Sequence, residues 1–256
     1  MWKVKGNAAQ AADNNSTGKS RHRFLRGWRK PGPRWLIVPL VILALFIPSA
    51  PCRGGAFAES VDMSSAGAPS ISGSLGGSVT GANDLTSDLQ VTVNFGELSP
   101  ANPNRVVVVV VPIAMRASGS YALNATVSGL SGGSANSLQL SDIGIGVQNL
   151  RSLGGKSSSC GVNSIITPAY NNNPSSAYSF GANGRAVFPS SLSTVGAGTA
   201  LITGPQLSKN GALKPRSDNG YAIDLILAVV PQFFTPGNFT VTITLQLTST
   251  CNNCGC

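Results

Sequence analysis

The chain alternates apolar and polar side chains with a period of two over several segments. From Phe239 to Leu247 every odd position is apolar and every even position is Thr or Gln. Similar alternation runs over Leu89–Phe95, Tyr121–Val127 and Ile143–Val147. Successive side chains of a strand point to opposite faces, so this pattern predicts half-buried strands.

Two further segments are almost continuously apolar, namely the six valines of Val106–Val111 and the run Tyr221–Val230. These predict strands buried on both faces, and Pro112 is expected to end the first ladder or to place it at an edge. Asn-Gly pairs at 183, 210 and 219 predict turns, because both residues tolerate positive φ. No segment shows a capped 3.6-residue period, so residues 88–249 predict an all-β fold, a single Ig-like or pilin-like sandwich of about eight to ten strands.

Residues 59–87 have a different composition, rich in Ser, Gly and Ala. Such a segment contains too few large apolar groups to offset the entropy cost of ordering it. The sequence therefore predicts a flexible linker before the sandwich.

The first 58 residues resemble a secretory leader with a long basic start. Nine of the first 34 residues are basic, and the 13-residue apolar run Trp35–Ile47 follows. This run is shorter than the roughly 20 residues that a membrane-spanning helix needs. Ala56 and Ala58 form a small-residue site, which predicts cleavage before Glu59 and a secreted or cell-surface protein without stable membrane insertion. The alternative is an uncleaved anchor.

Removing this leader changes the charge of the protein. The whole chain has a formal net charge of +9, but eight basic and eight acidic residues follow Ala58. A nucleic-acid partner requires a surplus of Lys and Arg, which the mature chain lacks. The single histidine, His22, and all three tryptophans also lie in the leader. We therefore expect no nucleic-acid binding, no catalysis that depends on histidine and no cofactor.

Four cysteines follow the leader. Cys160 lies in a Ser/Gly-rich loop, and the tail 250–256 carries Cys251, Cys254 and Cys256. An even number in an exported chain favours disulfides, and each of the three complete pairings joins Cys160 to the tail. Crosslinking between chains and binding of a soft metal by the same four sulfurs are the alternatives.

Three acids, Asp142, Asp218 and Asp224, are the candidates for carboxylate chemistry. Two carboxylates about 5 to 10 Å apart could hydrolyse a glycoside. Acids beside turns, however, are usually solvated or cap backbone groups. Asp218 precedes the Asn219-Gly220 turn, whereas Asp224 lies inside a predicted strand, where pairing with an arginine is expected. We predict that the protein is not an enzyme.

Short motifs across residues 88–249 resemble bacterial pilin-type sandwiches, in particular the spore coat U and chaperone-usher fimbrial families. The motifs are Val93-Asn-Phe-Gly96, Ser120-Tyr-Ala-Leu123, Gly204-Pro-Gln-Leu-Ser208 and Pro236-Gly-Asn-Phe-Thr-Val-Thr-Ile-Thr-Leu245. The resemblance implies a surface subunit that adds a strand to the open edge of a neighbour. The chain departs from these families in its Cys-rich tail and in the absence of a cysteine near Ile113, which argues against chaperone-dependent assembly.

Two functions follow from these observations. The first is an exported, non-catalytic structural or adhesive surface protein, such as a pilus-like or coat-like subunit, with self-association or other surface proteins as partners. The second is a secreted module that binds a small ligand or a metal through the tail cysteines, with Tyr170, Tyr178 and Tyr221 as stacking groups.

Overall fold

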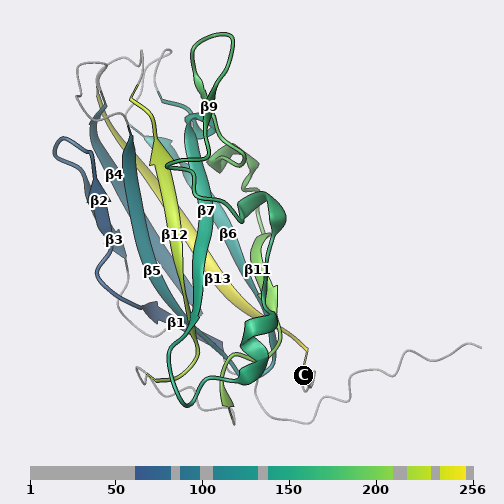
Figure 1. Cartoon of the computed structure of the whole chain (residues 1–256). Helices are drawn as coiled ribbons and strands as arrows, with labels where there is room; N and C mark the ends of the chain where they lie inside the picture. The colour runs from purple at the N-terminus through teal and green to yellow at the C-terminus, as the bar shows by residue number, and fades with distance from the viewer. Residues whose placement is uncertain are drawn as a thin grey trace, which may run out of the picture. The chain divides into compact units, whose positions relative to one another are not determined.

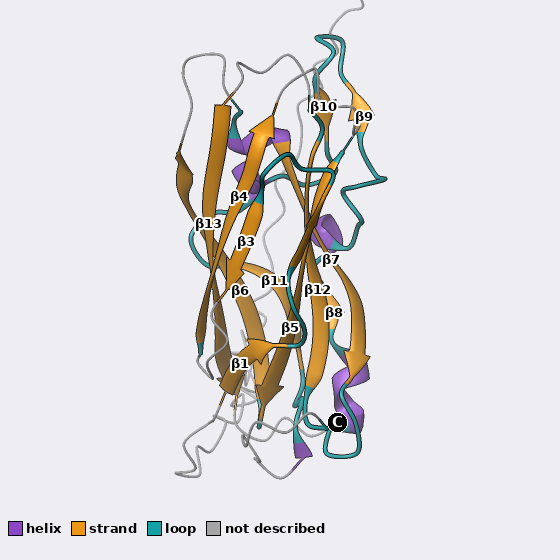
Figure 2. Ribbon diagram, turned by 90° about the vertical axis from the view of Figure 1, so that its left-hand side faces the viewer, coloured by secondary structure: helices purple, strands orange, loops and turns teal. Residues whose placement is uncertain are grey.

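The alternating segments form the strands of two antiparallel sheets that pack face to face (Figures 1 and 2). The protein is thus an all-β sandwich, as the sequence predicted. In this computed structural model the described residues belong to one compact unit within Pro48–Cys256, and they are 61–81, 87–98, 106–131, 138–209, 218–231 and 237–251. The predicted leader, with Ala56, Ala58 and Glu59, lies outside them.

The first sheet has five strands, and β5 is paired on both sides. Its order is β1-β5-β12-β7, and the short β2 also pairs with β5. The bounds are β1 (Val61–Ser65), β2 (Ser70–Ser72), β5 (Val107–Ala117), β7 (Ile143–Ser152) and β12 (Tyr221–Val229).

The second sheet has six strands in the order β3-β4-β13-β6-β11-β8. Its long central strand β13 pairs with β4 on one side and with β6 on the other. The bounds are β3 (Ser78–Gly81), β4 (Asp88–Leu98), β6 (Ser120–Ser131), β8 (Ile165–Ile166), β11 (Thr199–Gly204) and β13 (Gly237–Cys251).

The core lies between the sheets and takes one side of each alternating strand. In β13 the inward residues Phe239 to Leu247 are at most 1% exposed. The six valines also alternate, because Val107, Val109 and Val111 are buried whereas Val108 and Val110 are half-buried. The prediction that this strand is buried on both faces was therefore wrong. Its outer face is covered only in part.

Pro112 neither ends β5 nor lies at its terminus, since β5 continues to Ala117 and Pro112 pairs with Asp224 of β12. On the other side of β5, β2 pairs with residues 108–110 and β1 with residues 113–117. Pro112 falls at the junction, where its carbonyl accepts a hydrogen bond from the Ala66 amide at 3.0 Å. The missing N–H thus coincides with the gap between two edge strands.

Residues 61–81, which we name the strap, are strands and not the flexible linker predicted over 59–87. The β1 and β2 strands pair with β5 of the first sheet, and β3 pairs with β4 of the second. The strap thus closes one long side of the sandwich, and the sandwich extends N-terminally of residue 88 at least as far as Val61. Ladder hydrogen bonds and the fully buried Met63 offset the entropy cost that the composition implied.

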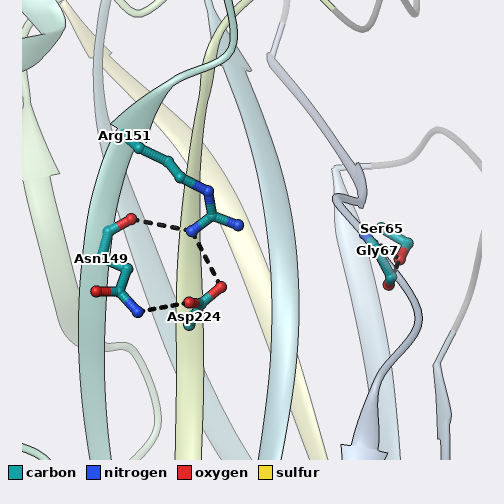
Figure 3. Close-up of polar contacts among 5 residues, drawn as sticks. All are labelled: Ser65, Gly67, Asn149, Arg151 and Asp224. Carbon is teal, nitrogen blue, oxygen red and sulfur yellow. Dashed lines mark hydrogen bonds and ion pairs between the residues drawn. The ribbon is translucent and has the colours of Figure 1, made fainter.

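A small polar turn shapes the strap after β1. The Ser65 hydroxyl donates to the Gly67 carbonyl and accepts from the Gly67 amide, so the chain bends before β2 (Figure 3). Further along, the Glu97 amide donates to the Leu75 carbonyl at 2.9 Å, which ties the strap to the far end of β4.

Residues 153–198 cover the opposite long side, between β7 and β11. The Ile145 amide donates to the Ser190 carbonyl at 3.1 Å, and β8 pairs with β11. The segment includes short 3₁₀ turns and a hairpin, whose bounds are η2 (Ser159–Asn163), η3 (Pro168–Tyr170), β9 (Ser179–Phe180), β10 (Ala186–Val187) and η4 (Leu192–Thr194). A further 3₁₀ turn, η1 (Leu140–Asp142), precedes β7.

The hairpin turn at Asn183-Gly184 is confirmed, since it joins β9 to β10 with Gly184 at φ +74°. Gly220 of the third pair also has positive φ and precedes β12, whereas Asn210-Gly211 lies outside the described residues. The described 3₁₀ turns are all too short to cross a membrane, and no other described helix is long and apolar enough.

Candidate functional site

Cys160 is the one post-leader cysteine whose side chain the structure describes. It lies in η2, is 5% exposed and is disulfide-bonded. The Ser158 hydroxyl accepts a hydrogen bond from the Cys160 amide at 3.2 Å and so fixes the start of the turn. A sulfur in a disulfide is not a thiolate, so Cys160 does not supply a metal ligand in this state.

Two buried tyrosines lie under η2. The Tyr221 hydroxyl donates to the Ser158 carbonyl at 2.7 Å, and burial raises its pKa. Gly161 rests directly on this ring, because a Cβ there would be 2.1 Å from a ring carbon. Burial also raises the pKa of Tyr121 strongly. These contacts dock η2 onto the end of the sandwich and hold Cys160 in place.

The end of β13 lies at this same end of the sandwich (Figure 1). Cys251 pairs through its backbone with Ser120 of β6, next to Tyr121. Tyr121 pairs with Gly204, where a Cβ would be within 3 Å of Ser164, just after η2. The backbone therefore brings Cys251 and the turn of Cys160 into one neighbourhood. The side chain of Cys251 and the tail with Cys254 and Cys256 lie outside the description, so a Cys160–tail disulfide stays a prediction.

Asp224 forms a polar cluster with two residues of β7 on the outer face of the first sheet (Figure 3). Its carboxylate accepts from Asn149 Nδ2 at 2.7 Å and from Arg151 at 3.1 Å, and the same Arg151 nitrogen donates to the Asn149 carbonyl at 3.1 Å. The pairing of Asp224 with an arginine is thereby confirmed.

A β-bulge builds this cluster. The register of β7 against β12 shifts between Ala222 and Asp224, and Asn149 has a φ of +57°. Asparagine tolerates this left-handed conformation better than other non-glycine residues do. Both carboxylate oxygens are engaged, so the cluster fixes the bulge and leaves Asp224 poorly placed for proton transfer.

The carboxylate of Asp142 serves the backbone and an arginine, whereas the contact at Asp218 is made by its main chain. Asp142 accepts from the Gln139 amide at 2.9 Å and from Arg185 at 3.2 Å, while the Asp218 carbonyl accepts from the Lys156 amide at 2.9 Å. Asp142 is adjacent to Ile143, which pairs with Val229, five residues along β12 from Asp224. At 3.4 Å per residue, these two acids lie at least about 17 Å apart along the strand. This separation exceeds the spacing that paired carboxylates need for glycoside hydrolysis.

Two of the three tyrosines considered as stacking groups are enclosed. Tyr170 and Tyr221 are at most 4% exposed, and the Tyr170 hydroxyl donates to the Thr194 carbonyl at 3.2 Å. Tyr178 packs edge-on against Phe180 with ring centroids 5.7 Å apart. The rings of Tyr170 and Tyr221 therefore serve the core and offer no free face to a ligand.

A buried ion pair that sequence reasoning missed joins the strap to the sandwich. Arg116 of β5 donates to Asp62 of β1 at 2.8 Å, and both residues are less than 8% exposed. The sequence did contain an indication of this pair, since Arg116 is the only charged residue in an otherwise apolar strand. Its partner could not be identified because Asp62 lies in the segment assigned as a linker.

No group of three or more His, Cys, Asp or Glu side chains converges within the described ranges in a way that could hold a metal ion. Comparison of the chain with protein-family models, with curated proteins and with solved structures gives no match. The fold and the side-chain arrangements above are therefore the basis for a functional proposal.

Proposed function

We propose that the protein is an exported, non-catalytic structural or adhesive component of the cell surface or the extracellular space. The leader pattern supports export. The observation that carries the non-catalytic part is the use of the enclosed carboxylates. Within the described residues, Asp62, Asp142 and Asp224 are each paired with an arginine. The fold thus uses its charged groups to position its own strands.

The position of the strap is consistent with this proposal. Only Glu59 and Ser60 separate the predicted cleavage site from the first residue of β1. Processing there would release a chain whose first described strand belongs to the strap that closes the sandwich. Both long sides of the sandwich are covered, as expected of a domain that persists outside the cell.

A pilus-like or coat-like subunit is one form of this proposal. The strap of one copy could pair with the β5 and β4 edges of another, because strand addition relies mainly on backbone hydrogen bonds. Light scattering of the oxidised protein over a wide concentration range distinguishes a polymerising subunit from a self-contained domain. Polymers that grow with concentration support a subunit, and a constant monomer supports a self-contained surface domain.

Cell fractionation tests the proposal itself. The full chain is expressed in a bacterial host, and the cytoplasm, envelope, cell surface and medium are probed. We expect a processed form that begins at Glu59 at the surface or in the medium. A matched control is Ala56→Lys/Ala58→Lys, which should retain the leader. Unprocessed protein in the cytoplasm in both cases would contradict the proposal.

A further inference from the structure

The outward side chains of β4, β13 and β6 form a continuous uncharged surface, which we name the neutral face. It is defined by Gln90, Thr92, Thr126, Thr242, Thr244 and Gln246. Over this patch the inward residues are apolar, and the six outward residues carry hydroxyl or amide groups. β6 and β13 contain no charged residue, and the acids of β4 lie near its ends, at Asp88 and Glu97.

Strand register arranges these groups in rows across the sheet. Thr80, Thr92 and Thr242 are direct neighbours on β3, β4 and β13. Two residues further along, Thr244 lies between Gln90 and Thr126. Neighbouring strands are about 4.8 Å apart, and successive outward residues on one strand are about 7 Å apart. The neutral face therefore presents hydrogen-bonding groups at regular intervals in two directions.

Most of these groups are available to a partner. Thr92 and Thr242 share a hydrogen bond at 3.2 Å. No described residue bonds the side chains of Gln90, Thr126, Thr244 or Gln246, and Gln90, Thr126 and Gln246 are exposed. Each hydroxyl can donate and accept, and each amide can do both at separate atoms. Figure 2 shows the second sheet with one side turned away from the first sheet.

The chemistry of the neutral face selects among partners. Threonine is common on strands because of its strand preference alone, and β4, β6 and β13 present no outward Lys or Arg. An anionic polymer or nucleic acid would need those cations. The core of a protein interface would need apolar or aromatic groups, which this face does not present. What remains is a neutral partner rich in groups that donate and accept hydrogen bonds.

We propose that the neutral face binds an uncharged polysaccharide. Sugar hydroxyls donate and accept as the threonines do, and an extended chain can follow the rows across an open sheet, whereas a small ligand needs a concave site. This inference rests on the proposed function, because it supplies the adhesive contact of an exported surface protein. The contact is built from neutral hydrogen bonds, so each bond contributes little and the binding is insensitive to salt.

The test uses the exported, oxidised full-length protein and three insoluble neutral probes, namely cellulose, chitin and cross-linked dextran, with alginate as the anionic probe. We expect retention on at least one neutral probe in low and high salt alike. The variant Thr126→Val/Thr244→Val removes two hydroxyls but keeps β-branched side chains of similar volume. We expect it to bind about tenfold more weakly. Ser70→Glu, an exposed change on β2 of the first sheet, is the matched control and should bind as the natural chain does.

Circular dichroism and thermal melting establish that the variants are folded. The inference is overturned if the exported protein binds no neutral probe, if it binds only alginate in a salt-sensitive way, or if the double valine variant binds as well as the natural chain. Each of these results leaves export and the surface role intact. Failure of export in the fractionation experiment would instead overturn the proposed function.

Discussion

At the residue scale, the fold depends on a few charged and polar groups that are enclosed between strands. Arg116 and Asp62 form the clearest case, because their ion pair is buried and a Ser64 hydroxyl also accepts from Arg116 at 3.2 Å. Removing one member of such a pair leaves an uncompensated charge in a poorly solvated place. The pair therefore fixes the register of the strap more than it adds net stability.

We predict that Asp62→Ala lowers the free energy of unfolding by about 3 to 5 kcal/mol. The double change Asp62→Ala/Arg116→Met should cost less than Asp62→Ala alone, because no buried charge is left unpaired. Denaturant unfolding measures both. Asp224→Ala is the control, since its partner Arg151 is 45% exposed and that pair contributes only about 0.2 to 1 kcal/mol. Equal losses for Asp62→Ala and Asp224→Ala would contradict this account.

The buried Tyr121 hydroxyl should make the free energy of unfolding depend on pH in the alkaline range. Burial raises its pKa in the folded protein, so above about pH 10 the unfolded chain loses a proton that the folded chain keeps. The free energy of unfolding is therefore unaffected by this group below about pH 10. Above that pH it falls by about 1.4 kcal/mol per pH unit for each such group.

In Tyr121→Phe the fall above pH 10 should be shallower. Below pH 10 the change should be small, since the hydroxyl has no hydrogen bond of normal geometry among the described residues. Denaturant unfolding between pH 7 and roughly pH 11 measures both effects. The same slope in both proteins would show that Tyr121 does not cause the alkaline loss.

At the element scale, the strap and residues 153–198 close the two long sides of the sandwich. Gly96 shows how closely the strap contacts β4, because a Cβ at Gly96 would be 2.3 Å from the Leu75 carbonyl oxygen. Its φ of +70° also places it in the left-handed region. Only glycine meets both conditions at this bulge.

Gly96→Ala should therefore loosen the strap selectively. The matched control is Gly129→Ala, since Gly129 has a φ of +81° but no atom near the added Cβ. We expect the control to lose about 1 kcal/mol from backbone strain and Gly96→Ala to lose more. Hydrogen exchange should accelerate at the strap amides in Gly96→Ala alone. Unchanged exchange there would mean that the Leu75–Glu97 contact does not anchor the strap.

Sequence patterns predicted the long strands and missed the elements that close the fold. Strands such as β4 and β13 are long enough for a period of two to be visible, and their buried faces follow it. The strap strands have three to five residues, and their stability comes from partners far along the chain. The arginine partner of Asp224 was predictable from a charge inside a strand, whereas the Asn149 bulge depends on a backbone conformation that no sequence pattern encodes.

At the scale of the whole molecule, the sandwich is covered on both long sides, and Cys160 near one end is disulfide-bonded. The cross-link restricts the unfolded chain, so reduction should lower the free energy of unfolding by about 2 to 4 kcal/mol. Denaturant unfolding with and without reductant measures this loss, and Cys160→Ser should remove most of the response to reductant, because a bond within the tail closes only a short loop. If reductant destabilises Cys160→Ser as much as the natural chain, the stabilising bond lies elsewhere.

The most direct test of the central claim, an exported and self-closed sandwich, is the intact mass of the protein recovered outside the cell, measured without reductant. We predict a chain that begins at Glu59 and is lighter by four hydrogens, with Cys160, Cys251, Cys254 and Cys256 all in disulfides. A chain that retains the leader and carries five free thiols, Cys52 included, would contradict it.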